Sequence, residues 1–115
     1  MRVLLVDDHS GFRRMVRRLL ESAGFIVVGE VATGGAVLAA VLAHRPDLVL
    51  LDVLLPDVSG MVVAERIAEL DAPPAVILMS SRLRSELAPI LARAPVRGFL
   101  QKDELTVGRV LELAG

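Results

Sequence analysis

Residues 48–60 read LVLLDVLLPDVSG, in which four consecutive apolar residues lead directly into an aspartate, Asp52. A strand without polar alternation is buried on both faces, which is typical of a parallel sheet covered by helices. Similar or weaker strand patterns occupy residues 3–6, 25–31, 75–79 and 98–101. The sequence therefore predicts a sheet of five strands.

Two helical patterns lie between the first three predicted strands. The first should end at Gly24, and its buried face is predicted to comprise Phe12, Met15, Val16, Leu19 and Leu20. The second should begin near Gly35 under a Thr33 cap and stop before Pro46, since proline disfavours helical geometry in the residue before it. Its inward positions are predicted to be Val37, Leu38, Val41 and Leu42.

Three further helical patterns complete the alternation. One follows Ser59 and Gly60, and the others cover about residues 85–94 and 106–113; the inward positions of the first are Val63, Ile67 and Leu70. Because proline is tolerated only in the first turn of a helix, Pro89 predicts that the second of these helices starts late and is short or irregular. Strands and helices that alternate through short loops predict one domain over residues 1–115, an α/β doubly wound parallel sheet with helices on both faces.

The composition excludes several classes of function. The chain has no cysteine, which excludes disulfides and thiolate chemistry. Its longest apolar run, residues 36–43, is too short to cross a bilayer of about 30 Å, and the N-terminus becomes acidic too soon for a signal peptide. We therefore expect no membrane segment and a cytoplasmic location. The formal net charge of −1 gives no general attraction to nucleic acid.

Polar side chains follow the strands at their carboxyl ends, where a doubly wound sheet places its ligand site. These residues are Asp7, Asp8, Asp52, Ser80 and Lys102. Three carboxylates held together repel one another, and Mg²⁺, which prefers oxygen ligands, offsets that repulsion. Carboxylates, a cation, a hydroxyl and an ammonium suit phosphoryl transfer, with Asp52 as the nucleophile that forms an acyl phosphate. Each aspartate alone fits a helix cap or a turn equally well, and Ser80 or Lys102 alone fits a turn or a solvated surface better, but four strand ends agree.

The whole pattern resembles the receiver domains of response regulators, which have a flavodoxin-like fold with strand order 2-1-3-4-5. The matching pieces are Val6-Asp7-Asp8, the spacing of Asp52, Pro56 and Gly60, Ser80, and Gly98-Phe99-Leu100-Gln101-Lys102. The resemblance implies a phosphorylation switch of two-component signalling, not a conventional enzyme. A histidine kinase or phosphotransfer protein would supply the phosphoryl group in a Mg²⁺-dependent reaction.

The roles known for the family fall on individual residues of this chain. The resemblance implies that Asp52 is the phosphoacceptor and that Mg²⁺ is held directly by Asp8, Asp52 and the backbone carbonyl of Leu54. Asp7 would act on the cation through water.

The resemblance also implies a switch. Ser80 would bond the phosphoryl group, Lys102 would pair with it, and Phe99 would turn inward into the space that the serine leaves. The face formed by residues 85–94, 98–101 and 106–113 would then change shape. An output domain or a protein partner would respond to that change, and homodimers through this face are common in the family.

Three alternatives remain open at this point. A receiver-like interaction module that is never phosphorylated would keep the fold, although none of the site residues is missing here. A Mg²⁺-dependent aspartyl phosphatase needs a second aspartate two residues after the nucleophile, where this chain has Leu54. A nucleotide-binding module would want a glycine-rich phosphate loop where this chain has Asp7 and Asp8.

The first helix carries four arginines, Arg13, Arg14, Arg17 and Arg18, which we interpret as its solvated outward face. Docking to a histidine kinase or phosphotransfer protein is a second interpretation of this face. Direct binding of nucleic acid by this domain is disfavoured, because no stacking aromatics accompany the arginines.

Overall fold

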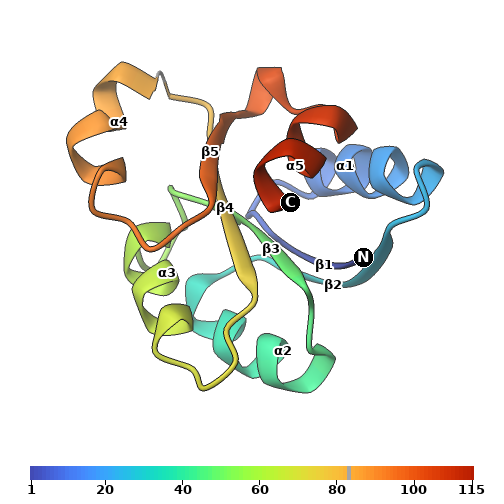
Figure 1. Cartoon of the computed structure of the whole chain (residues 1–115), viewed down its shortest axis with the longest axis horizontal. Helices are drawn as coiled ribbons and strands as arrows, with labels where there is room; N and C mark the ends of the chain where they lie inside the picture. Colours follow the sequence, from blue (N-terminus) through green and yellow to red (C-terminus); the bar gives the residue numbers. More distant parts are fainter. Residues whose placement is uncertain (83) are drawn as a thin grey trace.

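A parallel sheet of five strands forms the centre of the molecule (Figure 1). The computed structural model describes residues 1–82 and 84–115. Within them the strands are β1 (Arg2–Val6), β2 (Ile26–Val31), β3 (Leu48–Asp52), β4 (Ala75–Ser80) and β5 (Gly98–Gln101). They lie in the order β2-β1-β3-β4-β5, and every pairing is parallel. The predicted fold class and strand order are confirmed.

Helices cover both faces of this sheet (Figure 1). In the described residues they are α1 (Ser10–Ser22), α2 (Val37–His44), α3 (Gly60–Ala68), α4 (Arg84–Leu91) and α5 (Val107–Ala114), with 3₁₀ turns η1 (Gly34–Ala36) and η2 (Lys102–Glu104). The helices α1 and α5 pack on one face, and α2, α3 and α4 pack on the other. None of the described helices is long and apolar enough to cross a membrane.

Strand β3 is buried along its whole length because both of its faces are covered. Its residues alternate between the two layers: Leu48 and Leu50 pack towards α1 and α5, whereas Val49 and Leu51 pack towards α2 and α3. Full burial of one such side chain stabilises the fold by about 1.5–3 kcal/mol. The apolar run that predicted this strand therefore fixes the position of Asp52 at its carboxyl end.

The predicted buried face of α1 is too wide. Val16 and Leu20 are buried and Phe12 packs beside them, but Met15 is 53% exposed and Leu19 is also exposed. Residues four apart form one ridge along a helix, and the residue before each of them lies about 100° around the axis. Only the ridge faces the sheet here. Leu42, also predicted inward, is exposed for the same reason, since it follows the buried Val41 by one residue.

The start of α2 differs from the prediction. Instead of a cap from Thr33, whose side chain makes no capping bond to the described residues, the carboxylate of Asp57 accepts hydrogen bonds from the amides of Gly34 and Gly35 at 2.8 and 2.9 Å. These bonds tie the loop after β3 to the loop after β2. A carboxylate that accepts two amide protons outcompetes a local hydroxyl, and the backbone first forms η1.

The later helices follow the predictions more closely. Ser59 caps α3 by accepting a hydrogen bond from the amide of Met61 at 3.2 Å, and Thr106 caps α5. The prediction that Pro89 lies in the first turn of its helix is wrong, because α4 begins at Arg84 and contains the proline. The helix is nevertheless short, as expected, and it ends at Leu91.

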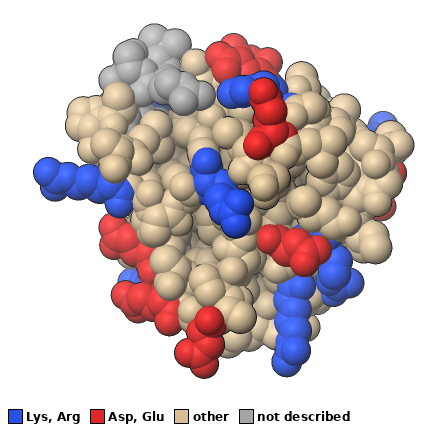
Figure 2. Space-filling model, viewed as in Figure 1, with Lys and Arg blue, Asp and Glu red and all other residues tan. Residues whose placement is uncertain are grey.

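Charged side chains of both signs are mixed on the face seen in Figure 2, without a large area of one sign. This mixture agrees with a formal net charge of −1. On this face the molecule has no broad basic surface of the kind that follows a nucleic-acid backbone.

Candidate functional site

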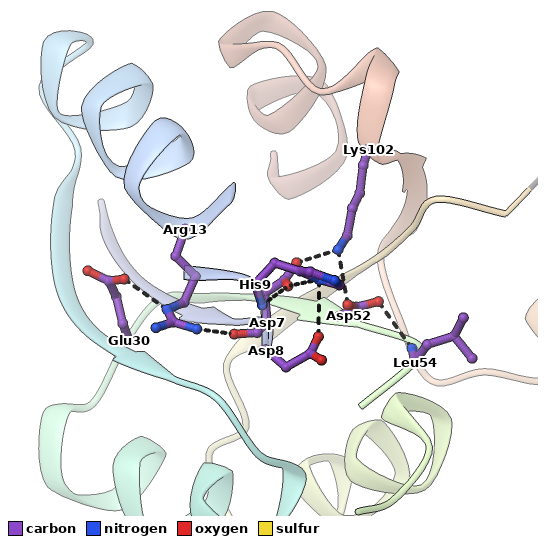
Figure 3. A network of polar contacts seen from close by, with 8 residues as sticks. All are labelled: Asp7, Asp8, His9, Arg13, Glu30, Asp52, Leu54 and Lys102. Atoms are coloured by element: carbon purple, nitrogen blue, oxygen red, sulfur yellow. Dashed lines mark hydrogen bonds and ion pairs between the residues drawn. The ribbon is translucent and has the colours of Figure 1, made fainter. Parts of the chain in front are cut away.

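The carboxyl ends of β1, β3 and β5 bring three charged side chains together (Figure 3). Asp7 follows β1, Asp52 ends β3 and Lys102 follows β5. The Nζ atom of Lys102 lies 2.6 Å from Oδ2 of Asp7 and 3.1 Å from Oδ2 of Asp52. Because β4 lies between β3 and β5, a residue that follows β5 needs a long side chain to reach the aspartates, and Lys102 has one.

Burial sets the electrostatics of this cluster. Asp7 is 1% exposed and Asp52 is 3% exposed. Burial raises the pKa of Asp52, although a hydrogen bond of 3.1 Å from the amide of Leu54 and the charge of Lys102 oppose that rise. Burial would also lower the pKa of Lys102, but its contacts with Asp7 and Asp52 outweigh burial and raise that pKa. Lys102 therefore stays charged at neutral pH.

One oxygen of Asp7 has incomplete hydrogen bonding. Oδ1 accepts a hydrogen bond from the backbone amide of His9 at 2.8 Å. Oδ2 is buried and forms no hydrogen bond within the described residues; its partner is the ammonium of Lys102, whose Nζ lies 2.6 Å away. Burying a carboxylate oxygen is costly, and the charge of Lys102 offsets part of that cost here.

The cluster also fits a divalent cation by charge. Asp8 lies at its more exposed side, and one ligand atom from each of Asp7, Asp8, His9 and Asp52 lies within 4.8 Å of the others. In the described part of the chain three carboxylates of this group face one ammonium, so a divalent cation balances the remaining charge. Mg²⁺ takes oxygen ligands from one or two carboxylates and keeps waters or phosphate oxygens for the rest. The donor set therefore suits Mg²⁺.

The remaining predicted site residues lie at or near this rim. Ser80 is buried at the end of β4, and its hydroxyl accepts a hydrogen bond from the amide of Arg82 at 3.0 Å. Leu54 meets Asp52 through its amide, and ligation by its carbonyl stays a prediction. Phe99 of β5 is only 4% exposed and packs in the layer of α2, α3 and α4. Its aromatic ring thus already occupies a buried position.

Sequence reasoning missed two neighbours of the cluster. The ring of Phe12 lies 4.6 Å from Nζ of Lys102, close enough for a cation–π contact. The imidazole of His9 lies between Asp7 and Asp8 (Figure 3). The only signal in the sequence was their place just after the acidic pair, and nothing there showed which side chains turn back over it.

Two arginines of α1 are less exposed than predicted. Arg13 donates to the carbonyl of Asp7, and Arg13 and Arg17 bind Glu30 of β2 at 3.0 and 2.7 Å. Burial would raise the pKa of Glu30, but the bonds from Arg17 and Arg13 lower it overall. These two arginines therefore hold α1 against the edge of the sheet, and only Arg14 and Arg18 form the exposed basic face.

Comparisons with known proteins agree on one family. The family described as the response regulator receiver domain matches residues 3–111. The chemotaxis protein CheY of Bacillus subtilis is 31% identical over 111 residues, which are 96% of this chain and 92% of CheY. The regulatory protein NarL of Mycobacterium tuberculosis is 36% identical over 104 residues, which are 90% of this chain and 48% of NarL. The chain also covers 50% of a Pseudomonas aeruginosa relative, so it spans about half the length of these two curated relatives.

Solved structures are similar to nearly the whole chain. The signal receiver domain of NarL from Mycobacterium tuberculosis has a TM-score of 0.86 at 36% identity, covering 98% of this chain and 94% of that one. A LuxR-family two-component response regulator from Aurantimonas sp. SI85-9A1 has a TM-score of 0.87 at 30% identity, with coverage of 99% and 85%. The chain therefore belongs to the receiver domains of two-component response regulators.

Proposed function

We propose that this receiver domain is a phosphorylation switch in which Asp52 accepts a phosphoryl group from a histidine kinase or phosphotransfer protein. The observation that carries the proposal is the contact of Lys102 with both Asp7 and Asp52 at the buried rim of the sheet. A carboxylate is a competent nucleophile for phosphorus, and a fixed ammonium stabilises the negative charge that spreads over the transferring group.

Mg²⁺ bound here would neutralise the carboxylates and the oxygens of the incoming phosphoryl group. Asp8, Asp52 and the carbonyl of Leu54 are the proposed direct ligands, and Asp7 is proposed to act through water. The clustering of the carboxylates of Asp7, Asp8 and Asp52 around a single ammonium supports a divalent cation here. The oxygen of Asp52 forms the new bond to phosphorus while the donor's own bond to phosphorus breaks, and Lys102 holds the oxygens of the transferred group.

The proposed switch runs from Ser80 to Phe99. Phosphorylation adds acceptor oxygens and about one further negative charge at Asp52. The hydroxyl of Ser80, which accepts from the amide of Arg82, would turn to donate to the phosphoryl group. Phe99 is already buried in the unphosphorylated chain. Phosphorylation would therefore raise the population of this buried position of Phe99, as in a shift between two states that already exist. The surface formed by α4, β5 and α5 would report that shift to an output domain, a protein partner or a second copy.

The phosphodonor is proposed to approach over α1. The exposed side of this helix forms a groove lined by Arg14, Met15, Arg18 and Leu19, with Leu105 from the segment before α5. Apolar side chains flanked by arginines suit a helical partner with an acidic rim. An aspartyl phosphatase is less well supported, because the position two residues after Asp52 carries the apolar Leu54.

The proposal is tested by incubating the protein with Mg²⁺ and acetyl phosphate and measuring the intact mass. We expect a gain of one phosphoryl group, which depends on Mg²⁺ and is absent in Asp52→Asn. Asp71→Asn is the matched control, because Asp71 is an exposed aspartate outside the cluster, and it should be phosphorylated like the parent protein. A gain that persists in Asp52→Asn, or no gain in the folded parent protein, would contradict the proposal.

A further inference from the structure

His9 adds a nitrogen donor to the carboxylate cluster. Its Nδ1 atom lies 3.1 Å from Oδ1 of Asp7 and 3.2 Å from Oδ1 of Asp8 (Figure 3). The side chain is 70% exposed, so solvent and ions reach the imidazole from outside. It makes no capping bond to α1 in the described residues, although His9 is the residue that precedes this helix. The imidazole is therefore directed at the acidic pair and not at the helix.

The two distances from Nδ1 of His9 match those between neighbouring ligand atoms of one metal ion. Metal–ligand bonds of about 2.1 Å place neighbouring ligand atoms about 3.0 Å apart in an octahedron and about 3.4 Å apart in a tetrahedron. The two distances from Nδ1 fall between these values. Imidazole nitrogen and carboxylate oxygen are both ordinary metal ligands, so all three atoms are of a suitable type.

Lys102 does not compete for this side of the cluster. It contacts Oδ2 of Asp7, whereas His9 contacts Oδ1 of the same carboxylate. A cation held by His9, Asp8 and Oδ1 of Asp7 leaves the ammonium in place. Because the ammonium already occupies Oδ2 of Asp7, a metal ion on the side of His9 would be bound through Oδ1.

We propose that His9 makes this a mixed oxygen–nitrogen site that binds Zn²⁺ in competition with Mg²⁺, with His9, Asp8 and Asp7 as protein ligands. Mg²⁺ is a hard cation that selects oxygen, whereas Zn²⁺ binds imidazole nitrogen and carboxylate oxygen together. The inference rests on the proposed function, since the same carboxylates would hold Mg²⁺. It adds that the side chain of His9 sets the preference of this site for Zn²⁺ over Mg²⁺.

Calorimetric titrations of the whole chain with ZnCl₂ and, separately, with MgCl₂ test this inference. His9→Gln should weaken Zn²⁺ binding by about tenfold or more, because even indirect partners of a metal commonly contribute about 10–100-fold in affinity. Mg²⁺ affinity should change by less than about threefold, since oxygen ligands dominate its site. His44→Gln is the matched control, because His44 is the only other histidine and lies at the end of α2. It should change neither affinity.

Nuclear magnetic resonance gives an independent readout, since the two histidines give two sets of ring signals. Zn²⁺ should shift the ring signals of His9 and leave those of His44 unchanged, and added Mg²⁺ should reverse the shift. Equal loss of both metals in His9→Gln, or unchanged Zn²⁺ affinity, would overturn the role of His9 while leaving the phosphorylation switch intact. A parent protein that binds no Mg²⁺ would instead overturn the proposed function.

Discussion

Replacing Lys102 with methionine removes the ammonium that faces Asp7 and Asp52 and keeps an unbranched stem of similar length. Lys102 is the only lysine of the chain, and it contacts both buried carboxylates. Without it, two carboxylates remain at the buried rim with no ammonium between them. The variant therefore measures what this ion pair contributes to the fold.

Removing one partner of a buried ion pair typically costs about 3–5 kcal/mol, because the other partner keeps an uncompensated charge. The side chain of Lys102 is 14% exposed, so some water reaches the cluster and reduces this cost. We expect the free energy of unfolding to fall by about 2–3 kcal/mol, which corresponds to a Tm lower by about 10 °C for a domain of this size.

Urea unfolding at neutral pH, with a chelator and then with Mg²⁺, measures this loss. Mg²⁺ should restore part of the stability, because a ligand that binds only the native state at 100 times its Kd adds about 2.7 kcal/mol. Arg14→Met is the control, since it removes an exposed cation of α1 and should change the free energy of unfolding by less than about 0.5 kcal/mol.

The contribution of Lys102 to the free energy of unfolding changes with pH in a definite direction. The contribution of Lys102 should be fully present at neutral pH, since its folded pKa is raised, and should be lost as pH rises through that folded pKa. The loss in Lys102→Met should also shrink in acid, where the carboxylates become protonated. A variant as stable as the parent protein in chelator, or a loss of equal size in acid, would refute this reasoning.

Four further predictions follow from the structure. Asp52→Asn should raise the urea midpoint in chelator, because burial raises the pKa of Asp52 and its charged form therefore destabilises the fold at neutral pH; an unchanged or lower midpoint would contradict this. Asp57→Asn should lower the midpoint at neutral pH and approach the parent in acid, because the amides of Gly34 and Gly35 lower the folded pKa of Asp57; equal midpoints at neutral pH would count against it. Gly60→Ala should cost about 1–3 kcal/mol in the same assay, since a Cβ there would lie 2.1 Å from the carbonyl oxygen of Asp52. Arg45→Gly should raise Tm in thermal unfolding by a few degrees, about 1 kcal/mol, because Arg45 ends α2 with a φ of 47°; a lower Tm would show that the arginine side chain matters more than its backbone.

The sequence predicted the sheet well because its central strands are buried on both faces. The apolar runs left few alternatives, and the strand at Gly98–Gln101 was predicted with its observed bounds. Since parallel strands end at one rim, the sequence also predicted that Asp7, Asp52 and Lys102 would meet, and they do.

What the sequence could not predict depends on long-range contacts. The exposure of Met15 depends on which ridge of α1 faces the sheet, and the pattern of apolar residues does not distinguish neighbouring ridges. The capping of Gly34 depends on Asp57, which is distant in the chain. The position of His9 over Asp7 and Asp8 depends on a side-chain rotation that no local pattern encodes.

The single lysine allows a direct test of the cation site. In protein carrying isotope-labelled lysine, Mg²⁺ titrated at neutral pH should move the one side-chain signal, because the ion joins the carboxylates that contact Nζ. The change in the position of this signal should saturate with increasing Mg²⁺, and it should be lost or strongly reduced in Asp8→Asn. A lysine signal that stays at the position of an unstructured peptide and ignores Mg²⁺ would contradict the account, since Lys102 and the carboxylates would then not share a pocket.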